Sequence, residues 1–214
     1  MVPDSIYDLV AARSAQIIET RRFFHGIPEL GFEENETGQA IADRLTSAGL
    51  KVERGIGKTG LVAVLEGAKA GPRLMIRADI DGLPVDELTG LDFASNNGRM
   101  HACGHDGHIT MAVTAAEILA GMKDQLSGTL IFVFQPAEEV VMGALAMIDD
   151  GLFEKYPADR VIGTHLWNQI PTGMIGVNRA TVFASADQFR LTVHGKGGHG
   201  AMPHKTIDPV AAIA

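Results

Sequence analysis

The densest group of chemically versatile side chains lies at positions 101–108, in the sequence HACGHDGH, which holds three histidines, a cysteine and an aspartate. Imidazole, thiolate and carboxylate groups are the ligands that zinc and neighbouring divalent metals use in proteins. Alone, the segment is ambiguous, because a lone cysteine is usually buried rather than coordinating and a histidine-rich turn can be solvated. A glutamate pair at 138–139 and His165 follow later strand-like runs. Together these groups indicate a metal site assembled from three loops.

Glu138 and Glu139 are adjacent, and neighbouring side chains outside a helix point in different directions. One of them can bind a metal while the other faces a substrate as a general base, a division that a single carboxylate cannot supply. The alternative is an acidic helix N-terminus, where glutamates interact favourably with the helix dipole.

Asp79 and Asp81 follow a strand-like run two residues apart, so their side chains point to the same side. Asp81 can hold a metal ligand in place, or both aspartates can form the turn that precedes Gly82 and Pro84. His25 lies in a loop and has no evident partner in the sequence, so we interpret it as structural.

Cys103 also permits a different chemistry, as a catalytic nucleophile with His105 or His165 as its base. Such a site does not need Glu138 and Glu139, whereas a bound metal accounts for all of these groups. The metal hypothesis is therefore preferred.

The elements that must position these groups alternate between helix and strand. The hydrophobic patterns predict helices over 5–24, 37–48, 107–122 and 142–150, and strands over 61–67, 73–79, 129–136 and 160–166. Strands separated by helices imply parallel pairing, so we expect an α/β fold with a mostly parallel or mixed sheet and helices on both faces. Functional groups of such sheets collect beyond the carboxyl ends of the strands, where the polar clusters lie.

The hydrophobic pattern changes near Thr181. Residues 185–195 alternate apolar and polar side chains, as a half-exposed strand of an antiparallel sheet does, and a glycine-rich turn follows. We therefore assign residues 1–181 to a catalytic domain and 182–214 to the beginning of a smaller α+β domain.

The last residues predict the start of a helix, with Asp208 as its cap and Pro209 at its first position. The sequence ends after roughly one and a half turns, and so short a helix is marginal alone. We therefore expect these residues to be the front part of a longer, truncated polypeptide.

Composition and charge restrict the class of protein. The 214 residues carry 18 basic and 26 acidic side chains, a formal net charge of -8, which argues against nucleic-acid binding because that binding needs a basic surface. One cysteine cannot form an internal disulfide, so a cytoplasmic location is expected. Neither an apolar run of about 18 residues nor a signal-peptide pattern is present in the sequence, so no membrane association is predicted.

Six motifs occur in order along the chain: RRFFHGIPELGFEENETGQAIADRL, IRADIDGLP, MHACGHDGHITM, FVFQPAEE, GTHLW and FASADQFRLTVHGKGGHGAMPHKTIDPV. In this order they resemble the M20-type metallo-amidohydrolases. The branch they resemble most contains hippurate hydrolase, N-acyl amino acid amidohydrolases and indole-acetyl amino acid hydrolases. The resemblance covers almost the whole chain.

The resemblance implies a zinc-peptidase-like catalytic domain, a smaller lid and dimerisation domain, and two divalent metal ions in each full-length subunit. Cys103, His105, Glu139 and His165 match the metal-ligand positions. Their mixed sulfur, nitrogen and oxygen donors suit Mn, Zn, Co or Ni.

The implied reaction is hydrolysis of the amide bond of a small N-acyl amino acid by metal-bound water. Glu138 matches the general base that activates this water, and Asp81 matches an aspartate beside the site. His199 matches a histidine of the smaller domain that reaches the active site of the partner subunit in a homodimer and stabilises the developing oxyanion.

Two alternatives to this function stay open. A metallo-dipeptidase or carboxypeptidase would use the same chemistry on peptides. A non-catalytic, metal-binding fragment is the other alternative, because chains of the family are nearly twice as long and carry a last metal-binding histidine in the part expected beyond Ala214.

Overall fold

The computed structural model describes residues 5–182, 184, 185, 187 and 189–214. The chain divides into two compact units, Met1–Asn168 and Gln169–Ala214. The helices of the first unit are α1 (Ser5–Ala12), α2 (Ser14–His25), α3 (Asn35–Ser47), α4 (His105–Ala120), α5 (Gly143–Asp149) and α6 (Leu152–Lys155), with a 3-10 turn at Lys123–Gln125. Its strands are β1 (Lys51–Ile56), β2 (Gly60–Glu66), β3 (Lys69–Asp79), β4 (Ser127–Gln135) and β5 (Arg160–Gly163).

The first unit is built on one sheet, whose strand order in the described residues is β1-β2-β4-β3-β5. Strand β3 pairs in parallel with β4 and β5, whereas β2 pairs antiparallel with β4 and β1. The expected mixed α/β sheet is therefore confirmed. The parallel register places Asp79 opposite Gln135 and Arg77 opposite Gly163, so β3, β4 and β5 end at the same edge.

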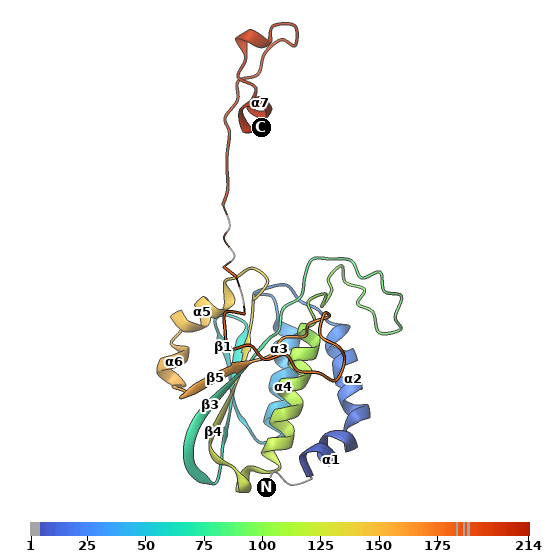
Figure 1. Cartoon of the computed structure of the whole chain (residues 1–214), viewed down its shortest axis with the longest axis vertical. Helices are drawn as coiled ribbons and strands as arrows, with labels where there is room; N and C mark the ends of the chain where they lie inside the picture. The colour runs from blue at the N-terminus through green and yellow to red at the C-terminus, as the bar shows by residue number, and fades with distance from the viewer. Residues whose placement is uncertain (1–4, 183, 186, 188) are drawn as a thin grey trace. The chain divides into compact units, whose positions relative to one another are not determined.

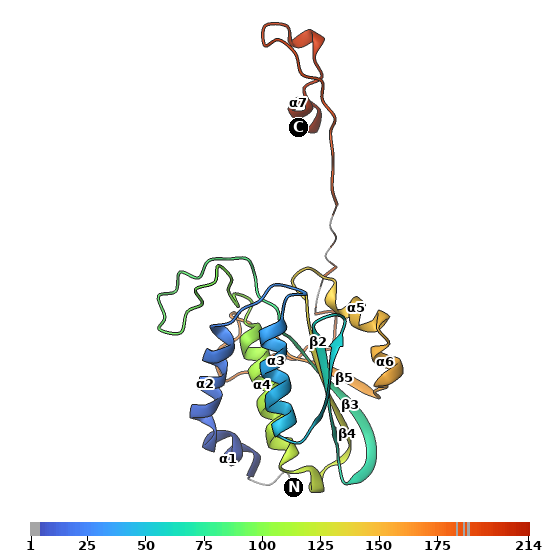
Figure 2. The ribbon, with the colours of Figure 1, turned by 180° about the vertical axis from the view of Figure 1, so that it is seen from behind.

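Helices cover both faces of this sheet, as Figures 1 and 2 show. Helices α3 and α4 lie against one face and α2 packs on α4, while α5 and α6 lie on the other face. Strand β4 explains why both faces need cover. Its Phe132 and Phe134 belong to the core under α3 and α4, and the alternating Ile131 and Val133 belong to the core on the opposite face.

The elements differ from the predicted ones at several bounds, and α6 was not predicted; three of the differences have a clear local cause. The helix expected over 5–24 divides at Arg13, beside a hydrogen bond from the Ser14 hydroxyl to the carbonyl of Ala11 at 2.8 Å. Strand β1 was not predicted, because its polar sequence KVERGI pairs on one side only and lacks a clear apolar alternation. Strand β5 ends at Gly163, earlier than expected, which leaves His165 in a loop.

The second unit contains a bridge between Lys196 and Ile207, a 3-10 turn at Pro203–Lys205 and helix α7 (Pro209–Ile213). The predicted cap of this helix is confirmed, because Asp208 Oδ1 accepts a hydrogen bond from the Val210 amide at 2.9 Å. Of the strand expected over 185–195, positions 186 and 188 lie outside the described residues, and the remaining positions are in no strand. A strand needs a pairing partner to form.

The predicted domain boundary between 181 and 182 lies within the second unit and stays a prediction. Across the described residues, no helix is long and apolar enough to span a membrane.

Candidate metal centre

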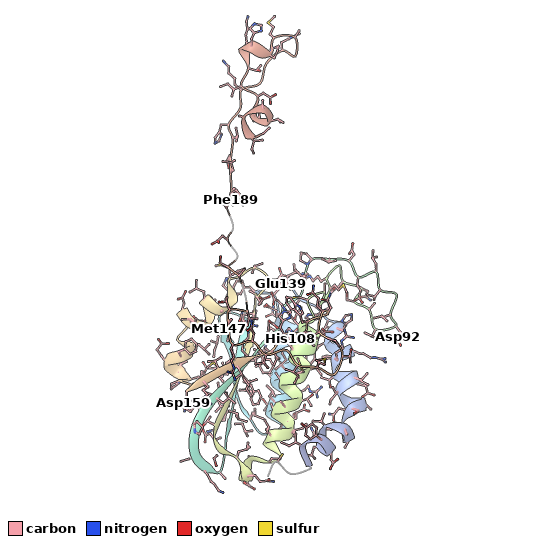
Figure 3. The ribbon with its side chains drawn as sticks, in the orientation of Figure 1. Asp92, His108, Glu139, Met147, Asp159 and Phe189 are labelled. Atoms are coloured by element: carbon pink, nitrogen blue, oxygen red, sulfur yellow. The ribbon has the colours of Figure 1, made fainter. Side chains whose placement is uncertain are left out.

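The groups singled out in the sequence meet at the edge of the sheet where β3, β4 and β5 end and α4 begins; Glu139 and His108 mark this edge in Figure 3. They are, in chain order, Asp79 and Asp81 at the end of β3, Cys103 and His105 at the start of α4, Glu138 and Glu139 after β4, and His165 after β5. We call this set the edge cluster.

The ligand atoms of the edge cluster form overlapping groups. Those of Cys103, His105 and His165 lie within 4.8 Å of one another, and so do those of His105, Glu138 and Glu139. The sulfur of Cys103 is 3.6 Å from His165 Nε2. The structure therefore brings all four predicted metal ligands together with Glu138.

His105 lies at the centre of the edge cluster, because its Nε2 atom faces three carboxylates. The distances are 3.7 Å to Asp79 Oδ2, 3.6 Å to Glu138 Oε2 and 3.8 Å to Glu139 Oε1. On the other side of the ring, Nδ1 donates to the main-chain carbonyl of Asp81 at 2.9 Å. Nε2 thus presents a lone pair to carboxylate oxygens unless a proton or a metal cation lies between them.

The donor atoms fit a divalent metal. His105 Nε2 and Glu139 Oε1 are buried and have no hydrogen-bond partner among the described residues. Buried polar atoms are nearly always partnered, and a cation between these two atoms would satisfy both. Imidazole, carboxylate and thiolate donors at this spacing suit zinc, manganese, cobalt or nickel.

The same geometry shifts the pKa values of the cluster. Burial lowers the pKa of His105, but the contact of its Nδ1 with the Asp81 carboxylate at 3.3 Å and the charges of Asp79, Asp81 and Glu139 outweigh burial and raise the pKa to about 9. Burial raises the pKa of Asp79, but the hydrogen bond from His108 and the charges of His105 and Arg77 lower it to about 2. Burial raises the pKa of Glu139. A proton on His105 therefore occupies the place that a cation would take.

Cys103 does not have the environment of a catalytic nucleophile. Burial and then the negative charges of Glu139, Glu138 and Asp79 raise the pKa of its thiol to about 12. A nucleophilic cysteine needs a lowered pKa and a positive environment, so the alternative of a cysteine nucleophile is disfavoured. A nearby cation would reverse this effect and stabilise the thiolate.

Asp81 is fully buried and contacts two of the predicted ligands. Its main-chain carbonyl accepts the hydrogen bond of His105 Nδ1, and its Oδ2 accepts one from the Glu139 amide at 3.0 Å. These contacts agree with the expectation that Asp81 holds metal ligands in place. The side chains of Glu138 and Glu139 differ in environment, since 37% of the first and 19% of the second are exposed.

His108 is a residue whose role the sequence did not reveal, although it lies one helical turn after His105. The Leu166 amide donates to His108 Nε2 at 2.8 Å, so the ring proton lies on Nδ1 and is donated to Asp79 Oδ1. The Leu166 side chain lies over Gly107, where a Cβ atom would come within 2.6 Å of it. His108 and Gly107 thus hold the loop that carries His165 against α4.

Two variants separate the hydrogen bonds of His108. In His108→Gln the amide oxygen can still accept from Leu166, whereas in His108→Asn the shorter amide can only replace the Nδ1 donor to Asp79. We expect His108→Asn to weaken Co²⁺ binding about 10–100-fold and His108→Gln to weaken it less. Cobalt titration followed by absorption spectroscopy measures both, and equal affinities of wild type and His108→Asn would contradict this role.

His25 is part of a buried network that supports the start of α4. Its Nδ1 lies 2.7 Å from Asp106 Oδ2, which also pairs with Arg21 Nε at 2.7 Å, and its Nε2 lies 2.9 Å from Glu87 Oε1. The structural interpretation of His25 agrees with these contacts. Its partners lie 81 and 62 residues away in the chain, which is why the sequence did not reveal them.

This network predicts a loss of stability in acid. Burial raises the pKa of Glu87, but hydrogen bonds from Thr89, His25 and the Ser95 amide outweigh burial and lower the pKa from 4.5 to about 2. A carboxylate with a lowered folded-state pKa stabilises the fold above its unfolded pKa, and this stabilisation is lost as the pH falls towards the folded value.

We therefore expect the free energy of unfolding to fall as the pH decreases from about 5 to about 3, and to fall less in Glu87→Gln. Urea unfolding at several pH values measures it. Glu36→Gln, which changes an exposed carboxylate, serves as the control. The same pH dependence in wild type and Glu87→Gln would be the contrary result.

His101 and His199 are not members of the edge cluster. His101 is buried, burial lowers its pKa to about 4, and neither ring nitrogen has a partner among the described residues. His199 belongs to the second unit, where its Nδ1 accepts a hydrogen bond from the Ala201 amide at 3.2 Å. The predicted contribution of His199 to the active site stays a prediction.

The chain is similar in sequence to a family of known proteins. Residues 75–210, which include the whole edge cluster, match the model of Peptidase family M20/M25/M40. The chain is 42% identical over 198 residues to thermostable carboxypeptidase 1 of Saccharolobus solfataricus, covering 91% of this chain and 50% of the relative. It is 42% identical over 214 residues to an N-acyl-L-amino acid amidohydrolase of Geobacillus stearothermophilus, covering 99% of this chain and 57% of the relative.

A solved structure agrees with the fold. The Bacillus subtilis YXEP protein, described as a dinuclear metal binding peptidase from the M20 family, superimposes with a TM-score of 0.74 at 39% identity, over 78% of this chain and 47% of that one. The chain thus spans about half the length of the curated relatives it matches.

Proposed function

Because the chain belongs to peptidase family M20/M25/M40, we propose that it carries the metal-binding part of an amidohydrolase that releases the amino acid from an N-acyl amino acid. The observation that carries the proposal is the edge cluster, in which four groups of metal-ligand type lie in two overlapping sets, one of which includes a partly exposed glutamate. The Geobacillus stearothermophilus relative, an N-acyl-L-amino acid amidohydrolase, supports this class of substrate.

Cys103, His105, Glu139 and His165 would hold the metal in this proposal, with two cations in each complete subunit. Divalent cations polarise a carbonyl oxygen and lower the pKa of water. His105 Nε2 and Glu139 Oε1, which are buried and have no hydrogen-bond partner in the described part of the chain, support ligation by these two residues. The mixed donors suit Mn, Zn, Co or Ni.

Glu138 acts as the general base and then as the general acid. It lies beside His105 but is more exposed than Glu139, so its carboxylate can reach both an attacking water and a substrate. Glu138 accepts a proton as water attacks the acyl carbonyl, and it returns this proton to the leaving amine. Asp81 keeps His105 and Glu139 in place through its two hydrogen bonds.

His199 is proposed to donate a hydrogen bond to the developing oxyanion from the partner subunit of a homodimer, a role usually worth about 10²–10³ in rate. This part of the proposal rests on the GKGGHGAMPH motif. A cytoplasmic location fits a cysteine that must stay reduced to bind metal. Light scattering and cell fractionation test these two points.

The experiment measures the amino acid released from N-acetyl and N-benzoyl amino acids by the metal-free chain, before and after addition of Mn²⁺, Zn²⁺, Co²⁺ or Ni²⁺. Release should require the cation, stop with a chelator and recover when the cation is restored. Absence of metal-dependent release from every acyl amino acid would contradict the proposal. Metal binding without any release would favour the non-catalytic alternative.

A second candidate is a carboxypeptidase or dipeptidase that uses the same site. The thermostable carboxypeptidase 1 of Saccharolobus solfataricus, which is as similar to this chain as the amidohydrolase, favours it. Dipeptides in the same assay distinguish the two, because a peptidase would cleave them faster than acyl amino acids.

A further inference from the structure

The turn that carries Glu138 and Glu139 lies in a strained part of the backbone. Four non-glycine residues in the described chain have a positive φ angle, namely Phe32 (67°), Lys58 (76°), Ala137 (50°) and Val141 (59°). They belong to three segments that are distant in sequence. Residues other than glycine rarely adopt a positive φ angle, and this backbone conformation persists where surrounding contacts enforce it.

Glu34 joins these three segments. Its side chain is fully buried, its Oε1 accepts a hydrogen bond from the Ala137 amide at 2.7 Å, and its Oε2 accepts one from the Thr59 hydroxyl. Ala137 immediately precedes Glu138, and Lys58 precedes Thr59. One buried carboxylate therefore contacts two of the strained segments and belongs to the third.

The Glu34 side chain is not needed to cap α3, because another residue accepts the hydrogen bonds of the first amides of this helix. Glu34 occupies the N-cap position of α3 but makes no side-chain capping bond. The carboxylate of Glu29 accepts hydrogen bonds from the amides of Asn35, Glu36 and Thr37 instead, at 2.8 to 3.1 Å. Capping of α3 thus does not explain why a carboxylate is buried at position 34.

Close contact with the backbone at Gly31 also supports the turn at Ala137. A Cβ atom at Gly31 would lie 2.9 Å from Ala137 Cα and 3.3 Å from a methyl group of Val140, so only glycine lets the two segments approach this closely. After the turn, the amides of Met142 and Gly143 donate to the Ala137 carbonyl at 3.3 and 3.1 Å.

We infer that Glu34 is a positioning residue that holds Ala137 in its strained conformation and thereby orients Glu138 and Glu139. The inference about catalysis rests on the proposed function, whereas the inference about the turn does not. Loss of the carboxylate leaves the Ala137 amide buried without its acceptor and lets the turn relax. A displacement of the base by about 1 Å can cost 10²-fold in rate.

Three variants test this role. Glu34→Ala removes both acceptors, whereas Glu34→Gln keeps an oxygen for the Ala137 amide and an NH₂ group for the Thr59 hydroxyl. Ala137→Gly makes a positive φ angle accessible without support, so it should partly restore the turn in the Glu34→Ala background. Glu36→Ala, which removes an exposed carboxylate two residues away, is the matched control.

The first measurement is amide hydrogen exchange of the peptide that covers residues 137–142 in the metal-free chain. We expect exchange about tenfold faster in Glu34→Ala, near the wild-type rate in Glu34→Gln, and unchanged in α4 and in the Glu36→Ala control. Unchanged exchange of this peptide in Glu34→Ala would overturn the inference. So would an equal increase in Glu34→Ala and Glu34→Gln.

The second measurement is hydrolysis of an N-acyl amino acid. Glu34→Ala should lower kcat about 10²-fold with KM changed less than about threefold, and Ala137→Gly should recover part of this loss. If wild type shows no hydrolysis, the proposed function fails while hydrogen exchange still decides the role of Glu34. If Glu34→Ala does not fold, hydrogen exchange is measured in Glu34→Gln and in Glu34→Gln/Ala137→Gly instead. Slow exchange in both variants supports the role of Glu34, and fast exchange in either variant overturns it.

Discussion

Replacing Glu138 with glutamine is expected to lower kcat for an N-acyl amino acid by about 10³-fold while leaving the metal content unchanged. Glutamine keeps the size and hydrogen-bonding capacity of the side chain but cannot take up the proton of the attacking water. Glu138 is the more exposed member of the pair, with 37% of its side chain accessible, and burial and contacts suit Glu139 better for holding a cation.

The variant Glu139→Gln is the comparison for Glu138→Gln. Glu139→Gln removes a charged ligand whose Oε1 atom is buried, so it should lower the metal content as well as kcat. Steady-state kinetics and metal analysis of both variants measure the difference. Activity of Glu138→Gln within tenfold of wild type, or the same loss of metal in both variants, would contradict the division of roles.

Replacing His105 with alanine is expected to weaken metal binding by more than about 100-fold. His105 belongs to each of the ligand groups of the edge cluster, and its Nε2 atom lies between Asp79, Glu138 and Glu139. Without the imidazole these carboxylates lose the nitrogen that completes the donor set.

Thermal unfolding with and without Zn²⁺ measures this effect. At a metal concentration about 100 times the Kd, binding stabilises the fold by about 2.7 kcal/mol, which raises Tm by roughly 5–10 °C in a chain of this size. The shift should vanish in His105→Ala and persist in His204→Ala, which changes an exposed histidine of the second unit. A full shift in His105→Ala would show that the metal binds elsewhere.

Local sequence patterns predicted most of the framework of the first unit. Strand β4 illustrates why, because its continuous apolar run divides into two sets of side chains, each facing a helical layer. Strand β1 shows the limit, since an edge strand with few buried residues has no distinct pattern. The four loops that carry the edge cluster could be ordered along one edge because parallel strands end together.

The positions of individual ligand atoms could not be predicted in the same way. Adjacent glutamates suggested a division of roles, but the exposure of each side chain and the hydrogen bond from the Glu139 amide to Asp81 depend on contacts with other segments of the folded chain. His108 was visible as one of three histidines in a short segment, yet its role depends on the amide of Leu166, 58 residues away.

The sequence by itself determined the chemical inventory of this protein: thiol, imidazole and carboxylate groups at the ends of predicted strands, in an order that resembles one family. Only the tertiary structure decided which atoms meet, that His105 faces three carboxylates and that Glu34 accepts a hydrogen bond from an amide 103 residues away. The physical reason is that periodicity reports which face of an element is buried. The direction of a lone pair or an amide is set by contacts between segments that are distant in the chain.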